Sequence, residues 1–239
     1  MLRLPVRNSL IAIILAMTAL PLLPEPVTGQ ADHLYHPEPI EPGSIVSTAG
    51  VSITFLPRTL VETEFRQAPL LDLRVRYGLP VQFSLEGGVR TNFFTNFIDL
   101  RGRYAFNLDP VYIGPSLRIG WWYGFAPFEG FDIQAESWMN FPGIDFGLTV
   151  DSVRFSATVE AQIISSLTIK TDGITTEQTR NEVGGYSLHL VLEQLFWGET
   201  STAVGLRVNY SKSLYQAWLA FSTFDTYLFY PEFTFGILF

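Results

Sequence analysis

The chain has 239 residues, with 15 Lys and Arg, 23 Asp and Glu, three His and no Cys. The absence of Cys excludes a disulfide framework, a thiolate metal site and a cysteine nucleophile, and three histidines are too few for a His-rich metal centre. We therefore expect no cofactor and no metal. The net charge of −8 excludes a nucleic-acid-binding role, because proteins of that class neutralise phosphates with basic residues.

The N-terminus has the layout of a secretory signal peptide. Arg3 and Arg7 precede an apolar core over residues 10–23, and a small-residue site ends at Ala31. This order of charged, apolar and small residues predicts a cleaved signal peptide over residues 1–31. A membrane anchor is the alternative, but the apolar core is short and contains a proline.

The remaining chain divides into a short tail and one long domain. Residues 32–43 are rich in proline and are predicted to form a periplasmic tail. Over residues 44–239, apolar and polar side chains alternate with a period of two, which predicts β-strands. The predicted strands, ten in all, cover residues 45–56, 70–78, 81–93, 98–106, 110–123, 142–150, 153–163, 185–196, 200–210 and 227–239.

Alternating strands fit a soluble sandwich or barrel with apolar side chains inward, or a transmembrane barrel with apolar side chains toward lipid. Three features favour the transmembrane barrel. The apolar faces carry no charge over about nine to eleven residues, the length that a tilted strand needs to cross a bilayer. The polar faces use Arg and not Lys, as a confined ion-pair network would. Aromatic residues gather at strand ends, as in interfacial girdles: Phe93, Phe94, Phe97, Trp121, Tyr123, Phe196, Trp197, Tyr227 and Phe229.

The connections between these strands alternate in length, which is typical of an up-and-down antiparallel barrel with short periplasmic turns and long outer loops. Short turns lie near residues 78–80, 107–110, 150–152 and 197–199, and the other connections cover residues 57–67, 91–96, 124–141, 166–184 and 211–226. An even number of strands brings both ends of the domain to the periplasmic side. The last strand should then pair with the first as well as with the one before it.

A twelve-strand barrel is the alternative. It requires extra strands in "TLVETEFRQ" (residues 59–67) and in "LYQAWLAFS" (residues 214–222). It also moves three of the longer loops to the periplasmic face, against the usual asymmetry of these barrels. We therefore expect ten strands.

The C-terminal sequence "FTFGILF" resembles the terminal strand signature of bacterial outer-membrane β-barrel proteins. Phe239 occupies the final aromatic position, and Phe233, Phe235 and Ile237 occupy the alternating apolar positions. Pro231 replaces the next apolar residue upstream. The resemblance implies a location in the bacterial outer membrane, contact with outer-membrane lipids, and recognition of this segment by the barrel-assembly machinery.

The polar faces of the strands place charged residues in the lumen. Two interpretations are open: a structural salt-bridge network that fills the interior, or a narrow polar path that favours anions. The predicted lumen-lining residues are Asp72, Arg74, Arg76, Glu86, Arg90, Asp99, Arg101, Arg103, Arg118, Asp145, Arg154, Glu160, Arg207 and Glu232.

One strand carries the ingredients of nucleophilic hydrolysis. In "YSLHLVLEQ", Ser187, His189 and Glu193 share the inward face. Ser187 and His189 are two residues apart on one strand, roughly 7 Å between Cα atoms, so a working base needs a contact from a neighbouring strand. A lumen histidine within the polar network is the other interpretation.

Two of the predicted loops are apolar. Lipid-interface packing is their default role, and a lid over the lumen or a partner site are alternatives. Their apolar side chains are Phe125, Phe128, Phe131 and Trp138 in residues 124–141, and Leu214, Trp218 and Phe221 in residues 211–226.

Together these features predict a non-enzymatic outer-membrane barrel that acts as a narrow passive channel or as a structural surface protein. A lipid-modifying hydrolase that uses Ser187 and His189 is the alternative from a different class. A secreted soluble β-protein is the third hypothesis.

Overall fold

The structure is a computed structural model that describes residues 33–57, 67–128, 131–196, 200–212, 215–220 and 226–239. No helix among these residues is long and apolar enough to cross a membrane. The elements are β1 (Ile45–Phe55), β2 (Gln67–Gly78), β3 (Phe83–Thr91), β4 (Thr95–Tyr104), β5 (Phe106–Asn107), β6 (Val111–Phe128), β7 (Phe131–Val150), β8 (Val153–Thr171), β9 (Ile174–Phe196), β10 (Thr200–Ser211), the 3-10 helix η2 (Tyr215–Ala220) and β11 (Leu228–Leu238).

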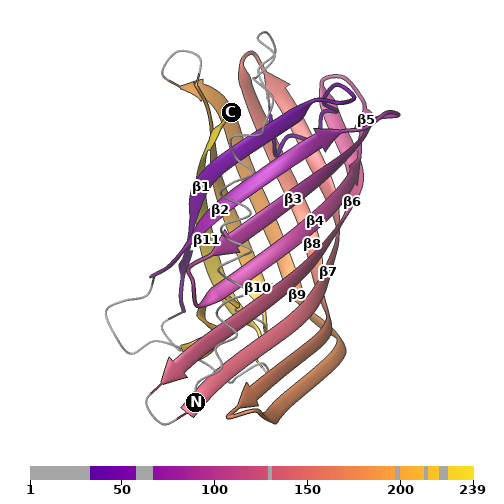
Figure 1. Ribbon diagram of the computed structural model, residues 1–239. Coiled ribbons are helices and arrows are strands. Elements are labelled where there is room, and N and C mark those ends of the chain that lie inside the picture. Colours follow the sequence, from indigo (N-terminus) through magenta and orange to yellow (C-terminus); the bar gives the residue numbers. More distant parts are fainter. Residues whose placement is uncertain (1–32, 58–66, 129–130, 197–199, 213–214, 221–225) are drawn as a thin grey trace. The chain divides into compact units, whose positions relative to one another are not determined.

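The strands form one closed antiparallel barrel (Figure 1). Successive strands pair along the sheet, and β11 returns to pair with β1, where Thr48 faces Leu238. The two-residue β5 continues the β4 edge against β6, so ten strands make up the wall. The predicted ten-stranded barrel is confirmed, and so is the pairing of the last strand with the first and with β10.

The two ends of the barrel differ. We call the end that holds Ile45 and Leu238 the terminal end, and the opposite end the hairpin end. At the terminal end, short turns join β2 to β3, β5 to β6 and β7 to β8. At the hairpin end, β6–β7 and β8–β9 continue as regular hairpins that reach lowest in Figure 1. The tall part of the wall is therefore built by four consecutive strands.

The prediction of long loops over residues 124–141 and 166–184 is wrong, because the structure continues strands through most of both segments. The alternation of side chains reverses there. Ala135 and Leu167 are buried on the inside, whereas Glu136 and Lys170 are exposed on the outside. A strand beyond the membrane faces water on its outer side, so it lacks the apolar outer face that identifies a membrane-crossing strand.

The twelve-strand alternative is also wrong. Residues 215–220, in the second proposed extra strand, form the 3-10 helix η2. Most of the first proposed extra strand, residues 59–66, lies outside the described residues. The loop between β10 and β11 thus contributes a short helix and no pair of strands in the part that the structure describes.

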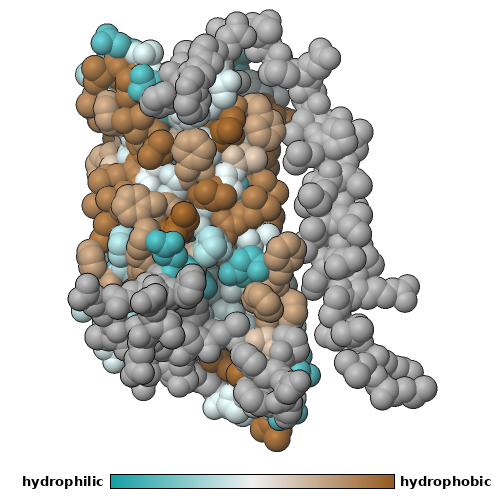
Figure 2. Space-filling model, turned by 90° about the vertical axis from the view of Figure 1, so that its left-hand side faces the viewer, coloured by the Kyte–Doolittle hydropathy of each residue, from teal (hydrophilic) through white to brown (hydrophobic). Residues whose placement is uncertain are grey.

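The outer wall of the barrel is apolar. In Figure 2, hydrophobic side chains predominate over the upper and middle parts of the wall that faces the viewer. Large apolar side chains such as Leu100, Val159 and Phe235 are exposed although they belong to regular strands. A continuous exposed belt of this kind is expected where a barrel contacts lipid, and it is opposite to the surface of a soluble β-protein.

The predicted aromatic girdle is only partly on the outside. Phe93, Phe94 and Phe229 are exposed at the hairpin end, as expected for a girdle. Phe97 is instead fully buried inside the barrel, because it continues the inward face of β4 that also carries Asp99. The Phe196 side chain and Trp197 lie outside the described parts of the structure.

Candidate functional site

Charged side chains fill the middle of the lumen. They come from the inward positions of β2–β4 and β6–β11, so the same period of two that exposes apolar residues to lipid gathers these charges inside. Arg154 is partly exposed, with 17% of its side chain accessible. The structure places every other predicted lumen-lining residue inside the barrel and buried: Asp72, Arg74, Arg76, Glu86, Arg90, Asp99, Arg101, Arg103, Arg118, Asp145, Glu160, Arg207 and Glu232.

Glu160 on β8 is the centre of one ionic cluster. Arg118 donates to both of its carboxylate oxygens, at 3.2 Å from Nε and 2.7 Å from Nη2. Arg101 from β4 also donates to Glu160, and Arg207 from β10 approaches to 3.9 Å. Three guanidinium groups from separate strands thus surround one carboxylate, which ties opposite parts of the wall together across the lumen.

A second cluster lies on the β2–β4 side of the barrel. Arg74 contacts Asp72 at 3.0 Å and Glu86 at 2.7 Å. Arg103 bridges Glu86 at 3.4 Å and Asp145 of β7 at 2.8 Å. The ion pairs therefore form a connected network and not a set of isolated contacts.

Charge in this network is balanced. Among the described residues, seven Arg and seven acidic side chains of the lumen are buried. Burying an unpaired charge costs several kcal/mol, so the pairing is needed for the fold to tolerate these residues. The arrangement corresponds to the salt-bridge network, the first of the two interpretations of the lumen charges.

An N-terminal segment packs inside the barrel at the terminal end. We call residues 33–44 the plug segment. The amides of Leu34, Tyr35 and His36 all donate to the Glu193 carboxylate, at 2.7, 3.0 and 2.8 Å. Successive N–H groups that converge on one anion can satisfy a carboxylate without an ion pair. Glu193 therefore anchors the plug segment to β9.

A second polar anchor and an apolar cluster hold the plug segment. Arg76 donates to the carbonyls of His36 at 2.6 Å and Glu38 at 2.9 Å. The apolar cluster consists of Leu34, Tyr35, Ile40, Val46, Val191, Ala203 and Leu238. The proline-rich composition does not reveal this packing. A sequence signal for it is the presence of apolar residues at inward strand positions near the terminal end: Val46, Val191, Ala203 and Leu238.

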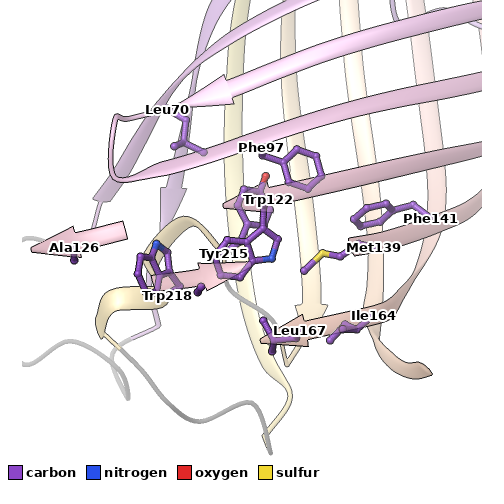
Figure 3. Packing of buried hydrophobic residues seen from close by; sticks show 11 residues of the cluster. Leu70, Phe97, Trp122, Ala126, Met139, Phe141, Ile164, Leu167, Tyr215 and Trp218 are labelled. Carbon is purple, nitrogen blue, oxygen red and sulfur yellow. The ribbon is translucent and has the colours of Figure 1, made fainter. Parts of the chain in front are cut away.

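Apolar side chains fill the lumen toward the hairpin end (Figure 3). Tyr215 of η2 stacks on Phe97, with ring centroids 4.8 Å apart. Trp218 of η2 packs against Trp122 and donates from its indole nitrogen to Thr95 Oγ1 at 3.1 Å. The loop after β10 therefore folds into the barrel. Its described part packs against the inner face of the wall, which is the placement that the lid alternative requires; its role stays a prediction.

The aromatic layer and the ionic layer are in direct contact. The Arg90 guanidinium lies 4.9 Å from the centre of the Phe97 ring, and that of Arg118 lies 3.8 Å from the centre of Phe141. A cation over an aromatic face in a dry site contributes on the order of 1–2 kcal/mol. Along the lumen, plug segment, ionic network and aromatic cluster thus follow one another.

The Ser187, His189 and Glu193 set is not assembled as a catalytic site. Within the described structure, no hydrogen bond joins Ser187 to His189. Arg207 occupies His189 Nδ1 at 3.3 Å, and both oxygens of Glu193 accept amides of the plug segment. A hydrolytic triad needs nucleophile, base and orienting acid in a chain of hydrogen bonds, and these contacts serve other partners here.

The plug segment contains two buried histidines that were not among the predicted site residues. His33 and His36 are buried, and their rings meet edge to face with centroids 5.5 Å apart. Burial lowers the pKa of His33 well below its usual value. Burial, with Arg154 and Arg76 nearby, lowers the pKa of His36 to about 3. Both imidazoles are therefore neutral at physiological pH.

The residues of the predicted assembly signal lie on the outside of β11 and directly after it. Phe233, Phe235, Ile237 and Phe239 are each between 43% and 49% exposed, so they belong to the apolar outer wall. Phe239 follows the last residue of the strand and exchanges two backbone hydrogen bonds with Ser47, at 3.0 and 2.9 Å. Their recognition by the assembly machinery stays a prediction.

Comparisons with known proteins agree with this fold. No protein-family model matches the chain, and no curated protein matches its sequence. Among solved structures, the outer membrane protease OmpT from Escherichia coli superimposes with a TM-score of 0.50 and 10% identity, covering 81% of this chain and 95% of that chain. The translocator domain of the autotransporter NalP from Neisseria meningitidis has a TM-score of 0.36 and 9% identity, covering 82% and 87%.

A third similar structure is the COG4313 outer membrane channel from Pseudomonas putida F1, with a TM-score of 0.37 and 7% identity, covering 90% of this chain and 100% of that chain. At such low identities the similarity to OmpT concerns the fold alone. The chain has the fold of the bacterial outer-membrane β-barrel proteins.

Proposed function

We propose that this protein is a closed, non-enzymatic outer-membrane barrel that serves as a structural surface protein and not as a passive channel. The observation that carries the proposal is the filled lumen. The plug segment, the ionic network and the aromatic cluster occupy it in succession, and the charged side chains between them are buried. A diffusion pathway needs polar groups that contact water along its length.

The hairpin end supports the surface role. The tall hairpins β6–β7 and β8–β9 continue beyond the part of the wall that carries apolar outer faces. Their outer positions hold exposed polar side chains such as Gln134, Glu136 and Lys170. By the usual asymmetry of outer-membrane barrels, this end faces the cell exterior.

The lipid-hydrolase alternative receives no support from these contacts. His189 and Glu193 are engaged by Arg207 and by backbone amides, and a candidate base must reach the proton that it abstracts. OmpT is an outer membrane protease, but a similarity in fold alone does not transfer an activity to this chain.

Conductance in planar bilayers tests the proposal. We expect no current steps at any applied voltage when the purified, folded protein is inserted, because the described charged side chains in the middle of the lumen are buried in ion pairs. A known porin added to the same bilayers is the control for insertion and detection. Reproducible single-channel steps from the wild-type protein would overturn the proposal and favour the narrow channel.

A further inference from the structure

The side chains of His33, His36 and Glu38 are gathered at the terminal end of the lumen. One nitrogen of each imidazole and one carboxylate oxygen lie within 4.8 Å of one another. In a tetrahedral zinc site, bonds of about 2.0–2.1 Å place ligand atoms roughly 3.4 Å apart. His36 Nδ1 and Glu38 Oε2 are already separated by 3.7 Å. Small side-chain movements therefore suffice to complete such a geometry.

In the part of the chain that the structure describes, the hydrogen bonds of this group leave one candidate ligand nitrogen, Nδ1 of His33, without a partner and hold another, Nδ1 of His36, only by a long contact. His33 Nε2 contacts the Glu38 carbonyl at 2.8 Å and must donate to it, so its Nδ1 carries the lone pair. That Nδ1 is buried and has no hydrogen-bond partner among the described residues. His36 Nδ1 accepts only a long contact of 3.3 Å from the Glu38 amide. A buried imidazole nitrogen without a partner is costly unless something else occupies its lone pair.

The atoms of His33 and Glu38 that would not bind the ion make hydrogen bonds that orient the two side chains, as in known metal sites. The Glu38 carbonyl holds the ring of His33, which is the usual way that proteins fix the tautomer of a metal-binding histidine. Tyr112 donates to Glu38 Oε1 at 3.3 Å, so Oε2 is the oxygen that faces His36.

Solvent can reach this group, but an ion there must share a ligand with Arg154. Arg154 Nε lies 3.5 Å from Glu38 Oε2, the oxygen that faces His36. Arg76 lies on the backbone side of the group, where it donates to the carbonyls of His36 and Glu38. The Glu38 side chain is 28% exposed, so the site opens to solvent at the terminal end.

We propose that His33, His36 and Glu38 bind a divalent first-row transition-metal ion, with zinc as the probe, and that the ion locks the plug segment in place. Two imidazoles and one carboxylate supply three ligands, and water completes the fourth position. All three ligands belong to six consecutive residues, so the ion cross-links the bend that places the Leu34–His36 amides on Glu193.

Isothermal titration with zinc chloride tests this proposal. The folded protein is purified in detergent with an affinity tag that contains no histidine, and folding is checked by heat-modifiable gel mobility. We expect one zinc ion per chain with a Kd on the order of 1 µM. His33→Ala, His36→Ala and Glu38→Gln should each weaken binding by at least about tenfold, since loss even of an outer-shell partner has that effect.

The chain contains only three histidines, so His189→Gln is a matched control that should bind zinc as the wild type does. Glu38→Gln keeps the experiment decisive if a histidine variant fails to fold. Zinc should also slow proteolytic cleavage within residues 33–44 of the wild type but not of Glu38→Gln. The proposal is wrong if the wild type takes up no zinc at about 100 times the expected Kd, or if the folded variants bind as tightly as the wild type.

Discussion

Single charged residues in the lumen contact side chains from several distant strands. Glu160 accepts from Arg118 and Arg101 and faces Arg207, so one carboxylate neutralises guanidinium groups from three other strands. Removing one member of a buried ionic group leaves its partners desolvated and unpaired, which costs more than the ion pair itself contributes. The stability of the barrel should therefore depend strongly on this residue.

Glu160→Gln should lower the free energy of unfolding by about 3–5 kcal/mol, because three buried guanidinium groups lose their common counter-ion. Urea unfolding of the protein in phospholipid vesicles measures this loss. Glu136→Gln is the control, since Glu136 is exposed on the outer face of β7 and its amide can still accept from Trp121 Nε1. The control should change stability by no more than about 0.5 kcal/mol. Equal losses of the free energy of unfolding in both variants would contradict the role of Glu160 as the common counter-ion of the three guanidinium groups.

At the scale of elements, two short segments occupy the two ends of the lumen, which the strands only surround. The plug segment is anchored by Glu193 and Arg76, and η2 is anchored by Trp218 and Tyr215. Gly124 on β6 makes room for Trp218, because a side chain there would collide with the indole. Both segments thus depend on particular residues of the wall: Glu193 and Arg76 bind the plug segment, and Gly124 leaves space for Trp218 of η2.

Glu193→Gln should release the plug segment while leaving the barrel intact. The side-chain amide of the variant has an NH₂ group where Glu193 has an acceptor oxygen, so this group faces a backbone N–H and one hydrogen bond is lost. A hydrogen bond to a charged group contributes about 1.5–3 kcal/mol. Cleavage by chymotrypsin near Tyr35 should accelerate about tenfold to hundredfold. Mass spectrometry of the cleaved N-terminus measures the rate. Gln194→Ala, at the next position on the opposite face of β9, should be cleaved at the wild-type rate. An unchanged cleavage rate in Glu193→Gln would refute the role of Glu193 as the anchor of the plug segment.

At the scale of the whole molecule, the barrel inverts the usual distribution of side chains. Charges lie inside and large apolar residues lie outside across the middle of the wall. Along the tall β6–β9 hairpins, apolar residues such as Ala135 and Leu167 lie inside and polar ones such as Lys170 lie outside. A lipid surrounding explains the first arrangement and water explains the second. The boundary between the two arrangements marks where the wall leaves the membrane.

An Arg on the outer wall should therefore be costly only within the apolar belt. Val159→Arg, on β8 beside Glu160, should lower the free energy of unfolding from vesicles by about 2–4 kcal/mol, as expected near the bilayer midplane. Ile174→Arg is the matched control at the tip of the β8–β9 hairpin, where the native side chain is 72% exposed, and it should cost less than about 1 kcal/mol. A similar cost at both positions would argue against the proposed boundary.

Much of the fold was predictable because its signal is local. The alternation in segments such as Leu71–Tyr77 depends on neighbouring residues, and it identified the strands, the lumen charges and the apolar wall. Prediction failed where the environment changes along one strand. Ala135 and Leu167 point inward beyond the membrane, and this reversal looked like a loop. Phe97 was assigned to the girdle although its position on β4 turns it into the lumen.

The sequence by itself determined the compartment expected for this protein, the strand count and which charged side chains face inward, because a period of two assigns each residue of a recognised strand to a face. Only the tertiary structure decided which segments pack inside the lumen. Leu34 meets Glu193, and Thr95 meets Trp218, across more than a hundred residues of chain. Contacts between segments so far apart leave no periodic signal, so they emerge only when the closed wall brings the segments together.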